Sequence, residues 1–409
     1  MIDTPVPTNQ KKKVLILSAD AGFGHRSAAK AILSALQDKY ADNCTVEMLN
    51  PLNDRRTPAF LRESQTDYDK IIQHIPKIYQ FGYEAMDAPI PTAIVDSAAT
   101  VLLYEVMRDI LMKIQPDAVI TTYPLYQAPL SAVITLEKLP IPLITVITDL
   151  VSVHSLWFNH AADVVTVATP ELKALALENG MAPEKVSITG IPVHPNITNE
   201  TRSKAQIRNT LGWNPDLPTF LAIGSRRVEG LVDAISVLNH FGRPLQVVAV
   251  AGNDKELYTQ LQQMDWHIPA HVYEFTEDIP AMLCAADAII CKAGGLITTE
   301  SLASGLPLML VDFIAGQETG NMQYVIENQA GDLAQDPLKI LEVISHWLMN
   351  DGALLKARAE NARKLGKPNA AYEIADLAMT ASKAGRKKTA SHKSLTDLLN
   401  LHQVPWQKK

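Results

Sequence analysis

Short apolar runs rich in β-branched residues alternate with helix-length amphipathic segments along almost the whole chain. The runs are continuously apolar, which is the pattern of strands buried on both faces of a parallel sheet. Alternating strand and helix signals predict doubly wound α/β units with right-handed crossovers. The strands are expected within 13–19, 117–123, 142–150, 163–169, 185–191, 219–225, 245–252, 271–275, 287–294 and 307–313.

The strand series is interrupted between residues 190 and 219, where Pro, Asn and other polar residues gather. A chain of 409 residues is long enough for two or three domains that each bury a core. We therefore expect two α/β domains facing a central cleft, over residues 1–195 and 196–382, followed by a basic tail over 383–409. In such sheets, ligands bind outside the carboxyl ends of the strands.

The net charge of -7 argues against general nucleic-acid binding, because neutralising phosphates requires a basic face. Three scattered cysteines, without metal-ligand spacing, indicate a reducing compartment. The N-terminus has no signal-peptide pattern, and no apolar run approaches the roughly 20 residues that a membrane span needs. We expect a cytoplasmic protein that associates peripherally with a membrane.

Two segments could bind a membrane surface, and the sequence does not decide whether they do. Residues 51–112 contain closely spaced aromatic and aliphatic side chains, which either pack into the core or form an exposed apolar face for lipid. The basic tail after Lys383 is either a solvated end or a site of attraction to anionic lipids.

A strand-to-helix turn within "CKAGGLITTESLASGLPLMLVDFIAGQETGN" carries the strongest binding signal. Lys292 and the pair Gly294-Gly295 end a strand and open a helix, an arrangement that binds anions. Glu300 lies further along this helix, where its carboxylate can accept both hydroxyls of a ribose. The turn after the next strand presents polar groups suited to sugar hydroxyls, at Gln317, Glu318 and Asn321.

In the first domain, "SADAGFGHRSAAKAI" follows a predicted strand and leads into a predicted helix. Glycines at positions 22 and 24 suit a tight turn with close backbone approach. His25 would then stand at a helix start, close to whatever the helix amides face. The pattern on its own also fits a plain strand-to-helix connection.

Together these segments resemble one glycosyltransferase family, which contains monogalactosyldiacylglycerol synthases, processive diacylglycerol glucosyltransferases and the peptidoglycan N-acetylglucosaminyltransferase (glycosyltransferase family 28). The opening loop resembles the family's N-terminal glycine loop that ends in histidine, and the "CKAGG" segment resembles its nucleotide-sugar site. "VITDLVSVHSLWF", "GIPVHP" and "GKPNAAYEIADLAM" resemble motifs of the diacylglycerol branch. The resemblance reaches to about residue 382.

The resemblance implies the GT-B fold and an inverting hexose transfer, of galactose or glucose, from a UDP-sugar to diacylglycerol. It also implies that no metal or other cofactor is required and that the closing helix near 370–382 can pack back on the first domain. The aromatic-rich segment and the basic tail add the expectation that a membrane surface, with anionic lipids, is a partner. His25 is then the candidate base, and Asp149 orients or activates a neighbouring group. Acceptor contacts are expected from Gly24, Tyr83 and His154. Donor contacts are expected from Gly224, Ser225, Arg226, Lys292, Gly294, Gly295, Glu300, Gln317, Glu318 and Asn321.

The chain departs from the family pattern at three places. Phe23 replaces a usual small residue, and His194 replaces a usual arginine. The family's glycine-rich phosphate loop is here "GSRRVEG", in which Arg226 or Arg227 could supply charge-assisted bonds in place of lost amide contacts. Two other functions stay open: a UDP-sugar 2-epimerase-like enzyme, and a degenerate GT-B protein with a binding or regulatory role.

Overall fold

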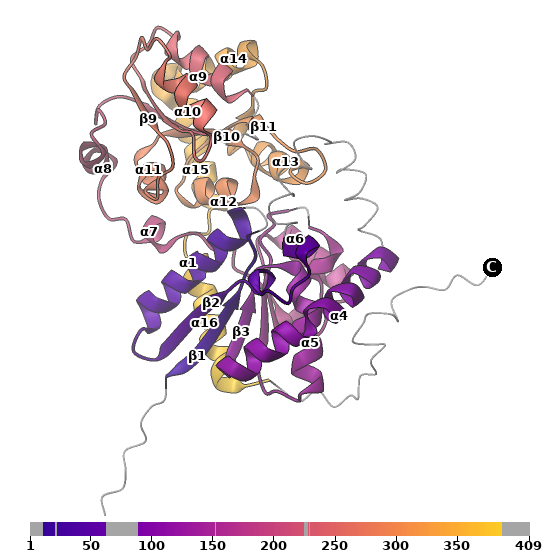
Figure 1. The fold of residues 1–409 in the computed structure, drawn as a ribbon. Helices are drawn as coiled ribbons and strands as arrows, with labels where there is room; N and C mark the ends of the chain where they lie inside the picture. Colours follow the sequence, from indigo (N-terminus) through magenta and orange to yellow (C-terminus); the bar gives the residue numbers. More distant parts are fainter. Residues whose placement is uncertain are drawn as a thin grey trace, which may run out of the picture.

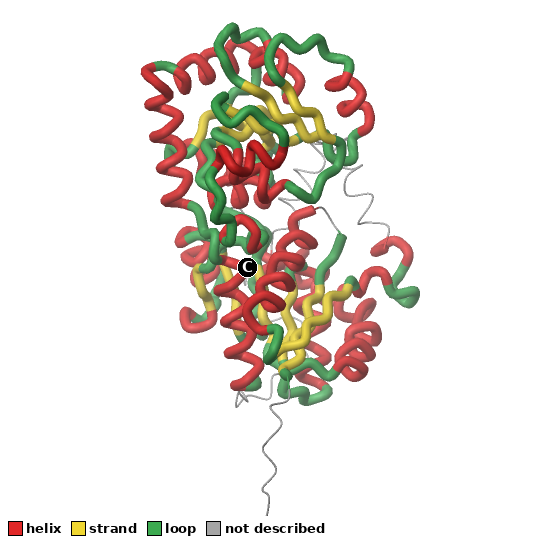
Figure 2. The backbone as a smooth tube through the Cα atoms, turned by 90° about the vertical axis from the view of Figure 1, so that its left-hand side faces the viewer, coloured by secondary structure: helices red, strands yellow, loops and turns green. Residues whose placement is uncertain are grey.

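The protein forms two α/β bodies, each built on a parallel six-stranded sheet (Figure 1). The structure, a computed structural model, describes residues 11–20, 23–62, 89–151, 153–224, 228 and 230–386. Figure 2 shows the two sheets one above the other, each flanked by helices.

The first sheet has the strand order β2-β1-β3-β4-β5-β6. One face packs against α1 and α16 and the other against α4 and α5, in two separate apolar clusters. The central strands β3 and β4 are buried at every position, as their continuous apolar sequences predict. The strands are β1 Lys12–Leu17, β2 Cys44–Leu49, β3 Ala118–Thr121, β4 Leu143–Val146, β5 Val164–Val167 and β6 Val186–Ile188; the helices are α1 Phe23–Tyr40, α4 Pro89–Ile114, α5 Gln127–Leu136 and α6 Pro170–Glu178; the short 3-10 turns are η1 Pro51–Asn53, η2 Pro124–Tyr126, η3 Ser155–Trp157 and η4 Pro183–Lys185.

The second sheet has the order β12-β11-β10-β7-β8-β9. One face packs against α9, α10 and α14, and the opposite face packs against α8, α11, α12, α13 and α15. In Figure 1, α12 lies at the side of this body that faces α1. The strands are β7 Thr219–Ile223, β8 Gln246–Val250, β9 Ala270–Tyr273, β10 Ala288–Lys292, β11 Leu308–Asp312 and β12 Gly331–Leu333; the helices are α9 Leu231–Asn239, α10 Lys255–Gln262, α11 Ile279–Ala285, α12 Gly295–Ala303, α13 Thr319–Glu327, α14 Pro337–Leu348 and α15 Ala353–Leu365, with the turn η5 Asn350–Gly352.

The chain passes between the bodies twice, and the two passages touch. The first runs through α7 (Pro195–Thr198) and α8 (Lys204–Leu211), and the second leads from α15 into α16 (Ala370–Ala384). A Cβ on Gly190, whose φ is +90°, would lie 2.5 Å from the Cβ of Lys367, so only glycine fits there. The resulting helix α16 (yellow in Figure 1) packs on α1, β1 and β3 of the first body.

All ten predicted strands are present, and the structure contains two further strands, β2 and β12, that were not predicted. In β2, buried and more exposed positions alternate because it is an edge strand, so it lacks the continuous apolar run. The other, β12, has only three residues. The expectation of burial on both faces is wrong for β6 and β9, which lie at sheet edges and are partly exposed.

For residues 51–112 the sequence left open whether the apolar side chains pack into the core or face lipid. Most of the aromatic side chains of this segment lie outside the described residues. Of the described part, Leu103, Met107 and Leu111 are buried, whereas Phe60 is 62% exposed and Val101 is 78% exposed. The described part of this segment therefore contributes to the core and also leaves two apolar side chains exposed, and its contact with lipid stays a prediction. Within the described ranges, no helix combines the length and the apolar character needed to cross a bilayer.

Candidate active site

The candidate residues gather where the strand order of each sheet reverses. In the first sheet the reversal lies between β1 and β3, and in the second between β7 and β10. In open α/β sheets, ligands bind outside the carboxyl ends of strands at such points. His25 follows β1, and the Lys292–Gly295 turn follows β10.

His25 is the third residue of α1, as its sequence context predicts. Its Nδ1 lies 2.8 Å from the Oγ1 of Thr148, and its ring packs edge-on against Tyr123, with 5.2 Å between ring centroids. Burial lowers the pKa of His25 to about 4, although a hydrogen bond with the Thr122 backbone opposes this shift. The imidazole is therefore neutral at pH 7 and able to accept a proton.

Hydroxyl groups at the ends of two strands contact this histidine, and the Ser18 hydroxyl after β1 contacts one of them. Thr122, directly after β3, donates its hydroxyl hydrogen to the carbonyl oxygen of His25 at 3.1 Å, and its Oγ1 also lies 2.9 Å from the Oγ of Ser18. Thr148, two residues beyond β4, holds the ring. Backbone and side chain of His25 are thus both anchored.

The Oδ2 of Asp149 accepts the indole Nε1–H of Trp157 at 2.7 Å. Burial raises the pKa of Asp149 to about 6, against the effect of this bond. The Trp157 ring is 1% exposed and its centroid lies 6.0 Å from that of His25. Asp149 therefore orients the indole that flanks the imidazole.

His154 caps the short turn η3, since its Nδ1 accepts the backbone N–H of Leu156 at 3.1 Å. Because one ring nitrogen accepts, a neutral His154 carries its proton on Nε2. Gly24 lies beside open space: a Cβ built there has no neighbour within 4 Å. The third acceptor candidate, Tyr83, lies outside the described residues.

The donor helix α12 begins against the first body. A Cβ on Gly295, its first residue, would lie 3.5 Å from the carbonyl oxygen of Thr148. The hydroxyl of the same Thr148 contacts His25. The structure therefore brings the N-terminus of α12 and His25 to two sides of one residue, although they come from different domains.

Glu300 lies in the second turn of α12 and is half-buried. Burial alone raises its pKa to about 7, because no cation or hydrogen-bond donor in the described part of the chain compensates for its desolvation. A carboxylate in this condition is ready to accept hydrogen bonds from a ligand.

Lys292 and Glu318 form a buried ion pair across the two turns, with 2.5 Å between Nζ and Oε1 and side chains 14% and 7% exposed. The second oxygen of Glu318 accepts the N–H of Ile314 at 2.8 Å. Asn321 donates its Nδ2 to the carbonyl of Ala293 at 3.1 Å. The turns after β10 and β11 are thus bound to each other. Lys292 and Glu318, which were both predicted to bind the donor, are paired with one another in the unliganded protein.

The remaining donor candidates are only partly described. Gly224 directly follows β7, and a Cβ there would lie 2.6 Å from the Cδ2 atoms of both Leu231 and Leu257, so a larger residue would displace these two side chains. Gly294 is the N-cap of α12, and Gln317 is half-buried just before α13. Ser225 and Arg226 lie outside the described residues.

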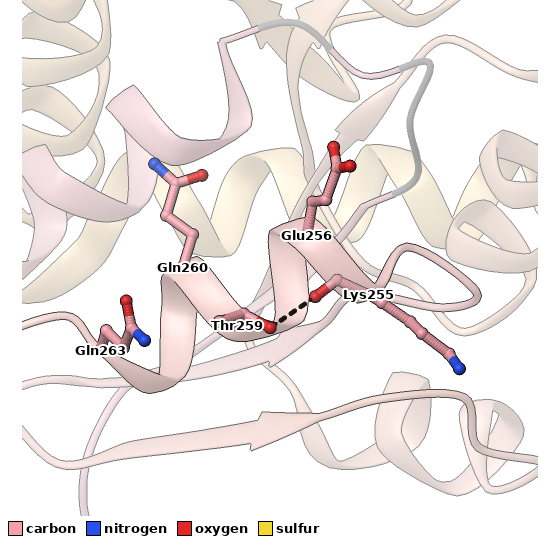
Figure 3. A pocket seen from close by; sticks show the side chains of 5 residues that line it. All are labelled: Lys255, Glu256, Thr259, Gln260 and Gln263. Atoms are coloured by element: carbon pink, nitrogen blue, oxygen red, sulfur yellow. Dashed lines mark hydrogen bonds between the residues drawn. The ribbon is translucent and has the colours of Figure 1, made fainter.

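A surface hollow of about 660 Å³ on α10 contains none of the predicted site residues (Figure 3). It is lined by Lys255, Glu256, Thr259, Gln260 and Gln263. Figure 3 shows these polar side chains along the outer face of one helix, with no convergent cluster of reactive groups. The position of the α12 start beside His25 is a stronger indication of the active site.

Sequence reasoning missed Thr148, Thr122 and Tyr123. A usable signal existed: a hydroxyl residue occurs within two positions of the end of β1, β3 and β4, at Ser18, Thr122 and Thr148. In a parallel sheet these ends meet at one edge, so the three side chains belong to the same site.

Comparison with known proteins identifies the family. Residues 25–193 match the family described as Monogalactosyldiacylglycerol (MGDG) synthase, and residues 221–376 match the Glycosyltransferase family 28 C-terminal domain. The chloroplastic monogalactosyldiacylglycerol synthase of Spinacia oleracea is 32% identical over 389 residues, which cover 91% of this chain and 74% of that protein.

Solved structures with a similar fold include MurG of Acinetobacter baumannii, with a TM-score of 0.57 and 19% identity, covering 90% of this chain and 99% of that chain. The UDP-GlcNAc 2-epimerase of Neisseria meningitidis has a TM-score of 0.58 and 16% identity, covering 90% and 100%. At these identities the likeness shows the GT-B fold and does not separate transferases from epimerases. The relatives found by sequence separate these two classes. They show that the chain belongs to the monogalactosyldiacylglycerol synthase family and is a glycosyltransferase of family 28.

Proposed function

We propose that the protein is an inverting hexosyltransferase that moves galactose from UDP-galactose, or glucose from UDP-glucose, to diacylglycerol. The observation that carries the proposal is the contact of Thr148 with both His25 and the start of α12, which puts a neutral base beside an anion-binding helix end. The names of the relatives favour galactose as the transferred sugar.

His25 takes the proton of the acceptor hydroxyl while that oxygen attacks the anomeric carbon of the hexose. The bond from this carbon to the diphosphate oxygen breaks in the same step, and UDP leaves with the bonding electron pair. One displacement from the opposite face inverts the anomeric configuration. A β-glycolipid is therefore expected from an α-linked donor.

The departing diphosphate needs positive charge. On this proposal it comes from backbone amides at the start of α12 and from the ammonium of Lys292, which is paired with Glu318 in the unliganded protein. On this proposal the chain needs no metal ion for catalysis. The acceptor is a lipid, so the protein binds a membrane surface, with the exposed Phe60 and Val101 and the basic residues after Lys383 as candidate contacts.

The direct test incubates the protein with phosphatidylcholine vesicles containing diacylglycerol and, separately, UDP-galactose, UDP-glucose or UDP-N-acetylglucosamine. We expect a monohexosyl lipid, formed fastest from UDP-galactose, with the β configuration by proton NMR. Excess EDTA should not change the rate, and anionic lipid should strengthen vesicle binding in a manner that salt weakens. Absence of any glycolipid from all three donors would refute the proposal.

Glu300 gives a prediction about the nucleotide. We propose that its carboxylate accepts the ribose hydroxyls, which favours the ionised form, so UDP should bind more tightly as pH rises from 6 to 8. Glu300→Gln should cost roughly 1.5–3 kcal/mol of UDP binding at pH 8, the value of a hydrogen bond to a charged group, and a smaller amount at pH 6. Calorimetry of both proteins measures this; the phosphate of UDP titrates in each, so their difference isolates Glu300.

The stability of the unliganded protein provides the control. A carboxyl whose pKa is about 7 when folded and 4.5 when unfolded stabilises the fold fully below pH 4.5, and this contribution is lost as pH rises through 7. Glu300→Gln should therefore melt at a higher temperature than the wild type at pH 8, and the gap should close as pH falls towards 4.5. An equal gap at every pH contradicts the assignment of a desolvated carboxylate.

A further inference from the structure

The contacts of Thr148 are those expected of a residue that determines which ring nitrogen of His25 carries the proton. It is 7% exposed, and the N–H of the preceding Ile147 donates to the carbonyl of Thr166 at 3.1 Å, which continues the sheet beyond β4. The backbone directly before Thr148 is thus bonded to β5. A hydroxyl on such a backbone has a defined position relative to the sheet.

Three contacts place the imidazole against this hydroxyl. Tyr123 lies edge-on to the ring at 5.2 Å, Trp157 lies at 6.0 Å, and Thr122 holds the backbone carbonyl of His25 at 3.1 Å. The Nδ1 edge then faces the Oγ1 of Thr148 at 2.8 Å, and His25 also forms a hydrogen bond with the Thr122 backbone, which favours a protonated ring nitrogen. The neighbouring Asp149, the more obvious partner in sequence, is engaged with the Trp157 indole.

We propose that Thr148 is the positioning residue of His25: its hydroxyl oxygen accepts the Nδ1 proton, which leaves Nε2 unprotonated as the atom that takes the acceptor's proton. A neutral imidazole carries one proton, so a hydrogen-bond acceptor at Nδ1 selects the tautomer with a free Nε2. The carbonyl of Thr148 also faces Gly295 at the start of α12, where a built Cβ would lie 3.5 Å from it, so the same residue lies near both the base and the donor helix.

The base role rests on the proposed function, whereas the tautomer can be tested without activity. Thr148→Val removes the hydroxyl at nearly constant shape, and Thr148→Ser retains it. We expect Thr148→Val to lower kcat roughly 10- to 100-fold, the range of a misplaced catalytic group, with little change in KM for the UDP-sugar. Thr148→Ser should recover most of the rate.

Thr166→Val is the matched control. Thr166 lies in the same sheet, is 1% exposed, and its Oγ1 has no hydrogen-bond partner within the described residues. Its replacement should leave both kcat and the tautomer of His25 unchanged. Melting temperatures of all three variants show whether each is folded.

The decisive readout is ¹⁵N NMR of protein labelled on histidine, with the His25 signals identified by their loss in His25→Gln. We expect a protonated Nδ1 and a bare Nε2 in the wild type and in Thr148→Ser, and loss of this single state in Thr148→Val. A wild type with no transferase activity would refute the proposed function but leave this NMR test in force. A wild-type tautomer protonated on Nε2, or a folded Thr148→Val with wild-type rate and tautomer, would overturn the proposal.

Discussion

His25→Ala is expected to lower hexose transfer roughly 100-fold or more while leaving the affinity for UDP nearly intact. Loss of a general base removes proton transfer in the transition state, which contributes about 10²- to 10⁴-fold. The nucleotide is proposed to contact α12 and Glu300 in the other domain, so its binding does not depend on the imidazole. Initial rates with vesicles and calorimetry with UDP measure the two quantities separately.

The pH dependence of the wild type should show the effect of the donor on this base. Burial lowers the pKa of His25 to about 4 in the unliganded protein, which makes it a weak base. A bound diphosphate brings negative charge to the start of α12, next to Thr148, and raises the pKa of the imidazole. The acid limb of the kcat profile reports the pKa of His25 in the enzyme–substrate complex, and the acid limb of kcat/KM reports its pKa in the free enzyme. The limb of kcat should therefore lie at the higher pH.

Stability gives the same group an independent signature. The folded pKa of His25 lies below its unfolded value of 6.5, so its contribution to stability is present above pH 6.5 and is lost as pH falls towards 4. His25→Ala should show a smaller loss of melting temperature over that interval. Near-normal turnover in this variant would remove His25 from the role of base.

The fold was accessible from the sequence because its signals are local. A buried parallel strand is a continuous apolar run, and the run 307–313 contains the observed β11, Leu308–Asp312. A helix start such as Gly294-Gly295 is a short motif with its own backbone geometry. The strands that were missed, β2 and β12, lack the local signal because one is half-exposed and the other has three residues.

The pairings inside the site were not accessible in the same way. Asp149 is adjacent to Thr148, and either side chain could have met His25; only the fold shows that the hydroxyl does. Lys292 and Glu318 were each predicted to bind ligand, and nothing in their spacing of 26 residues indicates that they bind each other. Such contacts depend on how two turns are placed in space, which a single sequence does not encode locally.

The Lys292–Glu318 pair yields the largest expected effect on stability. Lys292→Met removes the ammonium and leaves the Glu318 carboxylate buried with the N–H of Ile314 as its remaining partner. An uncompensated buried charge typically costs about 3–5 kcal/mol. We expect a correspondingly lower urea midpoint for Lys292→Met, and recovery of most of the loss in the double variant Lys292→Met/Glu318→Gln, because no unpaired charge is left and the glutamine oxygen still accepts from Ile314.

The matched control is Lys339→Met, which breaks a 2.9 Å pair with Glu342 whose side chains are 47% and 49% exposed. Water solvates the carboxylate left behind, so no measurable change in the urea midpoint is expected. Equal losses from Lys292→Met and Lys339→Met would contradict the burial argument.

Ligand binding then separates the roles of the two partners, because they have opposite charge. The ammonium attracts the diphosphate, so Lys292→Met should weaken UDP binding. Glu318→Gln removes a negative charge and leaves the Lys292 charge unneutralised for the phosphates, so UDP affinity should be kept or increased. Transfer should still fall in Glu318→Gln, because the carboxylate is proposed to bind the hexose and also holds the turn after β11 against Lys292. If Glu318→Gln instead loses UDP affinity to the same extent as Lys292→Met, the pair acts only as a structural bridge between the two turns, and the diphosphate is held by the start of α12.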